Sequence, residues 1–252
     1  MRLTVVGCSG SYPGPESPAS CYLVEETDAD GRVWRIVLDL GNGAFGALQR
    51  HADPLAIDAV CLTHLHADHC IDLTGYYVVR RYNPAGPQPQ LPVWGPSGTD
   101  DRLARAYDLP PEPGMTEEFG FRVYDGTFEL GPLTIEPRRV AHPVETYSLR
   151  ITAGGRTLTY SGDTGVCAAL DESAADADLF LVEASFVEGE DNPPDLHLTG
   201  REAAETAARA SARRVVLTHV PPWYSTDQVL ADAKGAYDGP LEMAEPGATY
   251  EV

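Results

Sequence analysis

Three histidines and an aspartate crowd into six residues of the chain, in the segment His64-Leu-His66-Ala-Asp68-His69. The segment follows an apolar run, 59–63, whose length suits only a buried strand, and the end of a strand holds side chains rigidly. In an extended loop the first two histidines point the same way and reach one cation, whereas Asp68 and His69 on the following turn reach a second. Burying so many polar groups without a metal is costly, so the spacing predicts two cations side by side.

Three more candidate ligands follow apolar runs elsewhere in the chain: His142, Asp163 and His219. A carboxylate in the position of Asp163 can bridge two metals, and the glycines beside it let other backbone approach closely. We therefore expect these strand ends to converge on the histidine-rich segment. His51 lacks such a setting and is expected to be an ordinary hydrogen-bonded histidine.

The rest of the chain alternates short apolar runs with helical patterns, without an internal repeat or a linker, which predicts one α/β domain over residues 1–252. Helices are expected up to residue 49 and over 71–82, 99–107, 199–212 and from 225, the last two beginning at the capping sequences Thr199-Gly-Arg-Glu202 and Ser225-Thr-Asp-Gln228. Strands are expected over 3–6, 21–25, 33–38, 59–63, 93–94, 121–124, 127–129, 133–140, 147–151, 157–160, 179–183 and 214–218.

Charge and composition narrow the function classes. The 18 basic and 38 acidic residues give a net charge of −20, which repels polyanions and disfavours extended nucleic-acid binding. No apolar run approaches a membrane span, and the first residues lead into a strand pattern rather than a signal peptide, so we expect a cytoplasmic protein without a membrane partner. The five cysteines form no C-x-x-C pair and are expected to be reduced thiols: Cys8, Cys21, Cys61, Cys70 and Cys167.

These residues together resemble the metallo-β-lactamase superfamily, whose motifs occur here in order as Asp39, His64-x-His66-x-Asp68-His69, His142, Asp163 and His219. The resemblance implies a four-layer αβ/βα sandwich with two metals. It assigns His64, His66 and His142 to the first metal, and it assigns Asp68, His69 and His219 to the second. Asp163 would bridge both metals, and Asp39 would orient a ligand by hydrogen bonding; an ordinary turn aspartate at a strand end is the alternative for Asp39.

A second motif narrows the branch of the superfamily. Glu183-Ala-Ser-Phe followed by His197-Leu-Thr-Gly-Arg resembles the Glu/His pair of ribonuclease Z and related phosphodiesterases. The resemblance implies that His197 is a general acid oriented by Glu183, with a hydroxide bridging the metals as nucleophile and Asp68 counted among the catalytic residues. The alternative is structural, with His197 preceding a helix and Glu183 ending a strand.

Only 20 residues separate His142 from Asp163, where ribonuclease Z carries its tRNA-binding arm. The resemblance therefore favours a compact phosphodiesterase of small substrates, a cyclic nucleotide first. A ribonuclease Z-like RNA endonuclease, an ester, thioester or lactone hydrolase, and a non-enzymatic metal-dependent scaffold stay open as alternatives.

Several features stay open at this point. Zinc is the expected metal and manganese the alternative, because histidine and aspartate ligands accept both. A two-fold dimer is the commonest assembly for such a chain. Arg80 and Arg81 either grip a phosphate or only end a helix, and Trp223 and Tyr224 either stack a base or pack in the core.

Overall fold

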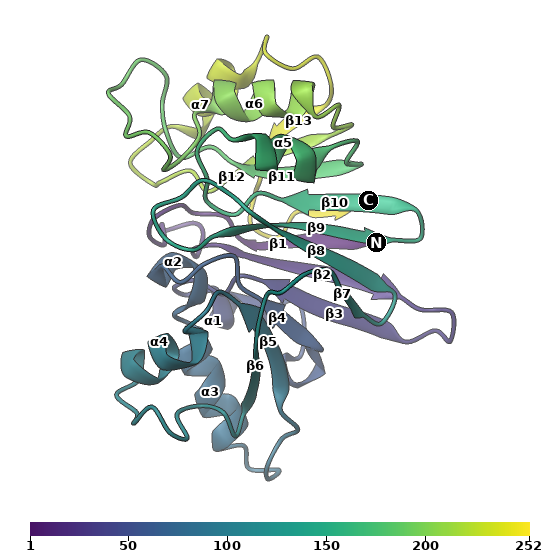
Figure 1. The fold of residues 1–252 in the computed structure, drawn as a ribbon, viewed down its shortest axis with the longest axis vertical. Coiled ribbons are helices and arrows are strands. Elements are labelled where there is room, and N and C mark those ends of the chain that lie inside the picture. The colour runs from purple at the N-terminus through teal and green to yellow at the C-terminus, as the bar shows by residue number, and fades with distance from the viewer.

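The computed structural model describes residues 1–252, in which two seven-stranded sheets pack face to face and helices cover the outer face of each (Figure 1). The first sheet carries the N-terminal helices, and the second carries the C-terminal helices. The order of layers is therefore helix, sheet, sheet, helix, which confirms the predicted four-layer αβ/βα sandwich.

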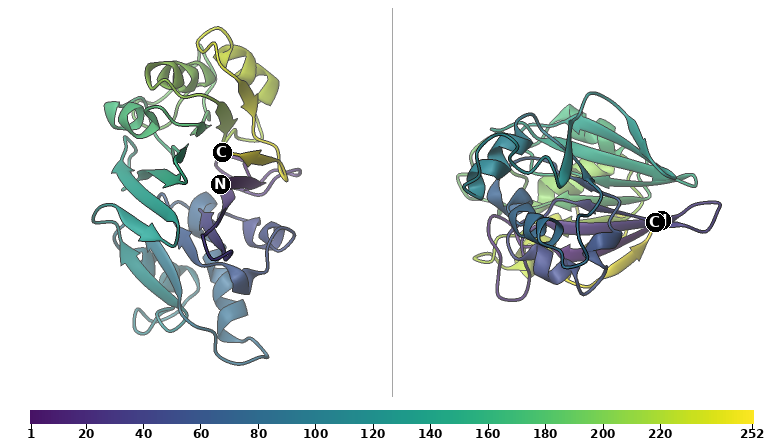
Figure 2. Two further views of the ribbon diagram at one scale, coloured as in Figure 1. Left: turned by 90° about the vertical axis from the view of Figure 1, so that its right-hand side faces the viewer. Right: turned by 90° about the horizontal axis from the view of Figure 1, so that it is seen from below.

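The first sheet has the order β14-β1-β2-β3-β4-β5-β6. It is antiparallel from β14 to β3 and parallel from β3 to β6. Because β14 pairs with β1, the two ends of the chain lie beside each other (Figure 2). The strands are β1 (Arg2–Gly7), β2 (Cys21–Thr27), β3 (Val33–Leu38), β4 (Ala59–Cys61), β5 (Leu91–Gly95), β6 (Phe119–Val123) and β14 (Thr249–Glu251).

The second sheet repeats this plan in the order β13-β12-β11-β10-β9-β8-β7. It is antiparallel from β7 to β10 and parallel from β10 to β13. The strands are β7 (Phe128–Leu130), β8 (Leu133–Arg139), β9 (Tyr147–Ala153), β10 (Arg156–Tyr160), β11 (Leu179–Glu183), β12 (Val215–Thr218) and β13 (Leu241–Met243).

Helices on the first sheet come from the first half of the chain, and those on the second sheet from the last third (Figure 1). None of them combines the length and the apolar character that crossing a membrane requires. The helices are α1 (Ala44–Leu48), a 3₁₀ turn η1 (Pro54–Ala56), α2 (Ala67–Cys70), α3 (Leu73–Arg81), α4 (Thr99–Ala106), α5 (Ala168–Ala174), α6 (Gly200–Arg209) and α7 (Thr226–Ala233).

The continuous apolar runs of the central strands are explained by burial on both faces. In β3, Ile36 and Leu38 enter the core between the sheets, whereas Val37 enters the core beneath the helices of the first sheet. In β11, Leu181 faces the inter-sheet core and Phe180 faces α5 and α6. Because one core is shared by both sheets, we infer that residues 1–252 fold as one unit.

Most predicted elements are confirmed, with ends that move by a few residues. The Thr199 cap is a full capping box with Glu202, whereas Ser225 accepts only the backbone N–H of Gln228. Helix α5 was not predicted, because its N-cap, Cys167, makes no side-chain capping bond that a sequence pattern could reveal. Strands β13 and β14 were also missed, because three residues are too few to show alternation.

Candidate metal centre

Both sheets deliver side chains to one place. The ligands follow the ends of strands β4, β8, β10 and β12. In the second sheet β8, β10 and β12 run in the same direction, so their ends lie at one edge. Three groups of potential metal ligands result, and two of them hold the predicted ligands: His64, His66, His142 and Asp163, and Asp68, His69, Asp163 and His219. The third joins Glu183 and His197 to His219. The structure thus brings together all seven residues that the sequence predicted as ligands.

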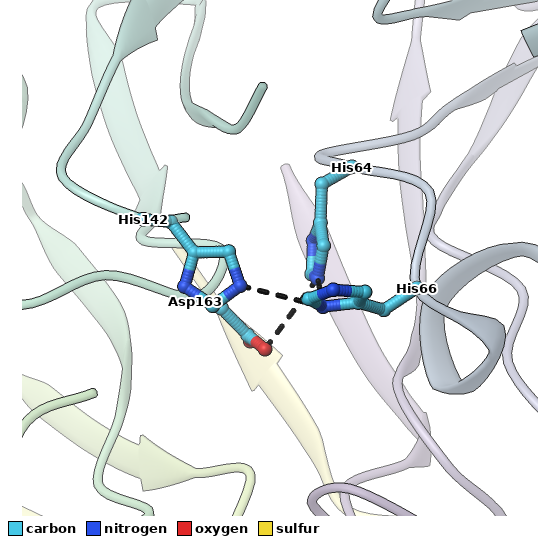
Figure 3. A group of neighbouring side chains, drawn as sticks. All are labelled: His64, His66, His142 and Asp163. Atoms are coloured by element: carbon cyan, nitrogen blue, oxygen red, sulfur yellow. Dashed lines mark hydrogen bonds and ion pairs between the residues drawn. The ribbon is translucent and has the colours of Figure 1, made fainter. Parts of the chain in front are cut away.

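The first group closes around the side chains shown in Figure 3. Nε2 of His64 lies 3.0 Å from Nδ1 of His66, and Nε2 of His142 lies 3.3 Å from the same atom. Oδ2 of Asp163 lies 3.6 Å from Nε2 of His64. His66 and His142 keep some solvent access, whereas His64 and Asp163 are buried, so the group is open on one side only.

The second group is buried throughout. Nε2 of His69 and Nε2 of His219 lie 3.0 Å apart, and Oδ2 of Asp68 lies 3.4 and 3.2 Å from them. Oδ1 of Asp163 completes the group at 3.2 Å from His69 and 3.4 Å from His219. Asp163 therefore presents one oxygen to each group, which is the arrangement a bridging carboxylate needs.

Hydrogen bonds behind the histidines fix which ring nitrogen faces the centre. The hydroxyl of Thr63 donates to Asp39, so it accepts from Nδ1–H of His64, 3.0 Å away. The hydroxyl of Ser185 donates to the carbonyl of His219 and accepts from Nδ1–H of the same residue at 2.7 Å. In both histidines the Nε2 lone pair is consequently left to the centre.

Two further histidines also donate a hydrogen bond from Nδ1–H. Nδ1–H of His142 donates to the carbonyl of Leu196 at 2.9 Å, and Nδ1–H of His69 donates to Oδ2 of Asp39 at 2.7 Å. The Nε2 atoms of these four histidines thus all point into the two ligand groups, where their neighbours are other imidazoles and carboxylates. A cation is the group that satisfies them together.

Asp39 is fully buried, and its carboxylate accepts hydrogen bonds from several residues. It accepts the backbone N–H of Thr63 at 2.7 Å and the hydroxyl of Tyr160 at 2.9 Å, in addition to the imidazole of His69. It therefore lies where the resemblance implies an orienting residue. Asp39 and His219 both adopt positive φ, 56° and 61°, a strained conformation that is typical of functional sites.

The ionisation states of four ligands, three histidines and Asp163, suit a metal directly. Burial lowers the pKa of His64 well below its ordinary value, and burial also lowers those of His66 and His142, so these imidazoles are neutral. Burial alone would raise the pKa of Asp163, but His219 and His69 hold it well below its ordinary value, so the carboxylate is ionised. In His69, burial lowers the pKa but the carboxylates of Asp163, Asp39 and Asp68 raise it well above its ordinary value, so a cation must displace a proton there.

One buried carboxylate oxygen also indicates a cation. Oδ1 of Asp163 is buried and has no hydrogen-bond donor, although an unpaired buried carboxylate oxygen is costly. A divalent cation between the imidazoles and the carboxylates would satisfy this oxygen and the imidazole lone pairs together. The residues present therefore fit a metal centre.

A Glu–His pair lies at the edge of the two groups. Nδ1 of His197 lies 2.9 Å from Oε1 of Glu183 and 4.0 Å from Oδ2 of Asp163. Glu183 is buried and accepts the backbone N–H groups of Thr164, Ser185 and Leu198 at 2.7, 3.2 and 3.3 Å. The carboxylate has a fixed position, and it fixes the imidazole in turn.

Other candidate residues stand apart from the centre. Arg80 is buried and donates to the carbonyls of Glu118 and Pro89, and Arg81 pairs with Glu117 and Glu118. Both guanidinium groups are thereby engaged away from the ligands, as the helix-end interpretation implies. His51 is exposed and belongs to neither group.

Sequence reasoning missed the residues that support the ligands. Thr63 and Ser185 lie within two residues of predicted site residues in the chain, but a hydroxyl at a strand end carries no signal of its own. Gly10 and Gly41 were also missed: a Cβ on Gly10 would lie 2.0 Å from the carbonyl oxygen of His219, and one on Gly41 would lie 1.9 Å from that of Asp68. Only the folded chain brings these segments together.

Comparison with known proteins agrees with this geometry. The family model described as "Beta-lactamase superfamily domain" matches residues 34–220. An uncharacterized protein of Mycobacterium leprae is 48% identical over 100% of this chain and 89% of its own length. Ribonuclease Z of Myxococcus xanthus is 28% identical over 100% of this chain and 98% of its own length, across an alignment of 310 positions.

A solved structure gives the same result at the level of the fold. The probable metallo-hydrolase YhfI of Bacillus subtilis is 26% identical over the full length of both chains. Its crystal structure superposes with a TM-score of 0.87 and covers 100% of this chain and 99% of that one. With the family model matching most of the chain and the ligand groups in place, the chain belongs to the β-lactamase superfamily and is a metallo-hydrolase of that fold.

Proposed function

We propose that this chain is a binuclear, zinc-dependent phosphodiesterase that hydrolyses a small diester, a cyclic nucleotide first. The observation that carries the proposal is the Glu183–His197 pair beside Asp163. Two metals in the two ligand groups would supply the activated water and the positive charge that phosphodiester hydrolysis needs. Five imidazoles among the ligands favour zinc, with manganese as the alternative.

His197 has the properties of a general acid. Its Nδ1–H donates a hydrogen bond to Glu183. No protein group forms a hydrogen bond with its Nε2, so Nε2 is free to contact a substrate. Burial lowers the pKa of His197, but the charge and hydrogen bond of Glu183 outweigh it and raise the pKa to about 9. The imidazolium attracts an anionic diester and holds a proton that the leaving oxygen can accept.

The same pair separates this proposal from ester and lactam hydrolysis. A phosphodiester is anionic from the start and is attracted by a fixed imidazolium on binding, whereas a neutral carboxylic ester gains from one only when charge develops in the transition state. Phe186 packs edge-on against the ring of His197 at 5.1 Å and restricts its movement. The orientation of the acid is therefore set before a substrate arrives.

The dimensions of the chain support a small substrate. Residues 143–162 form little more than strands β9 and β10 with a two-glycine turn, so no arm extends from this segment. The ribonuclease Z relative needs 310 alignment positions against the 252 residues here. Together with the net charge of −20, this short hairpin favours a cyclic nucleotide over a long RNA.

The test is hydrolysis by the metal-reconstituted protein of cyclic AMP, bis-p-nitrophenyl phosphate and a nitrocefin-type lactam. His197→Ala is expected to lower kcat for the diesters by about 10²- to 10⁴-fold, the usual contribution of a general acid. His51→Ala is the matched control, because His51 is an exposed histidine outside the ligand groups.

Each alternative has its own outcome in this assay. Hydrolysis of the lactam or of a carboxylic ester, unaffected by His197→Ala, would overturn the phosphodiesterase proposal. Cleavage of a long RNA in preference to cyclic AMP would replace the cyclic nucleotide by an RNA substrate. No cleavage of any diester at full metal occupancy would leave a metal-binding scaffold.

A further inference from the structure

Two large aromatic side chains are exposed together near the metal centre. Trp223 is 61% exposed and Tyr12 is 38% exposed, although the other two tryptophans, Trp34 and Trp94, are at least partly buried. The rings of Tyr12 and Trp223 lie 5.0 Å apart between centroids and are tilted by 34°. The contact with Tyr12 restrains the indole, although most of its surface is open to solvent.

Both residues are tied to the metal ligand His219. Trp223 follows His219 by four residues, so the two α-carbons are at most about 14 Å apart. Tyr12 follows Gly10, whose backbone N–H donates to the carbonyl of Val220 at 3.1 Å and whose α-carbon packs on the carbonyl of His219. The aromatic pair therefore lies on two segments that are joined to each other beside the metal ligand His219.

A third loop reaches the same place. The rings of Trp223 and Tyr224 meet edge to face at 6.2 Å, and the hydroxyl of Tyr224 donates to Glu190 at 2.9 Å. Glu190 belongs to the loop that leads from Glu183 to His197. Trp223 is thus the exposed member at the junction of the loops that carry His219, Gly10 and His197.

We propose that Trp223, supported by Tyr12, is the surface on which the base of a nucleotide diester stacks while its phosphate lies at the metal centre. An indole face accepts any nucleobase, and such stacking adds affinity without a charged contact. That suits a chain whose net charge of −20 gives it little affinity for phosphate elsewhere. The inference rests on the proposed phosphodiesterase function and adds the part of the substrate that is recognised.

The experiment compares two substrates on the metal-loaded protein: cyclic AMP and the ribose 3′,5′-cyclic phosphate that lacks the base. Trp223→Ala is expected to lower the ratio of kcat/KM for cyclic AMP to kcat/KM for the abasic diester by about ten-fold, the effect of losing one base stack. Trp223→Phe should restore most of the ratio, because it restores an aromatic face. Tyr82→Ala is the matched control, because Tyr82 is 65% exposed and lies at the end of α3.

A binding measurement provides a second readout. Adenosine 5′-monophosphate is expected to quench the tryptophan fluorescence of the wild type, and Trp223→Phe should remove that quenching. An unchanged substrate ratio in Trp223→Ala, or equal quenching in Trp223→Phe, would overturn the stacking proposal and leave the phosphodiesterase proposal intact. A wild type that cleaves neither diester would overturn the phosphodiesterase proposal itself. A short oligonucleotide that shows the larger loss in Trp223→Ala would assign the surface to a base of RNA.

Discussion

Oδ2 of Asp39 lies 2.7 Å from Nδ1 of His69, and both side chains are fully buried. The carboxylate accepts the hydrogen bond of Nδ1–H, so the opposite nitrogen of the ring faces Asp163 and His219. A buried carboxylate behind a metal-binding histidine fixes the ring and makes its free nitrogen a stronger ligand.

The first prediction follows from that contact. Asp39→Asn keeps the size of the side chain but removes the charge that sets the proton on His69, so metal affinity is expected to fall by about 10- to 100-fold. Competition with a chromophoric zinc chelator measures the loss. Asp176→Asn, at an exposed position with a comparable positive φ, is the control and should bind metal as the wild type does. Equal affinity in Asp39→Asn would show that the contact with His69 is only structural.

Asp163 should decide whether both metals bind. Its two oxygens face different ligand groups, so Asp163→Asn removes a charged ligand from each. Elemental analysis after dialysis is expected to give two metals per wild-type chain and less than one per variant chain. Loss of one metal with full retention of the other would contradict a bridging role and assign Asp163 to a single site.

Gly41 is expected to be indispensable for a steric reason. A Cβ at this position would lie 1.9 Å from the carbonyl oxygen of Asp68, a contact that atoms cannot tolerate. Gly41→Ala should displace the segment that carries Asp68 and His69, costing about 1–3 kcal/mol of stability and weakening metal binding. Gly46→Ala is the control, because its Cβ meets no atom within 4 Å, and the substitution should stabilise the helix by up to about 1 kcal/mol. Chemical denaturation compares the two variants.

Removal of the metals should lower thermal stability, because the ligands come from both sheets and a metal binds only the folded chain. At a free metal concentration of about 100 times Kd, binding adds about 2.7 kcal/mol, which for a chain of this size lowers Tm by about 5–10 °C when a chelator is added. Differential scanning fluorimetry measures the shift. Asp163→Asn should respond much less to the chelator; an equal response in both would mean that the stabilising metal binds elsewhere.

The ligand set was predictable because each ligand follows a strand that the sequence reveals. His64 to His69 follow the apolar residues of β4, and His219 follows those of β12. Helix α5 and strands β13 and β14 carry no such pattern, and the sequence analysis missed them. The two-fold dimer and the identity of the metal stay predictions.

The sequence by itself determined the periodicity of the strands, the kinds of ligand and their places at strand ends, because these depend on neighbours along the chain. The tertiary structure decided which atom of each ligand faces the centre. That choice depends on partners distant in sequence, such as Asp39 for His69 and Ser185 for His219, which become neighbours only when the two sheets pack together. The exposed pair of Tyr12 and Trp223 has the same origin, because 210 residues separate its members and only the closed fold places one ring on the other.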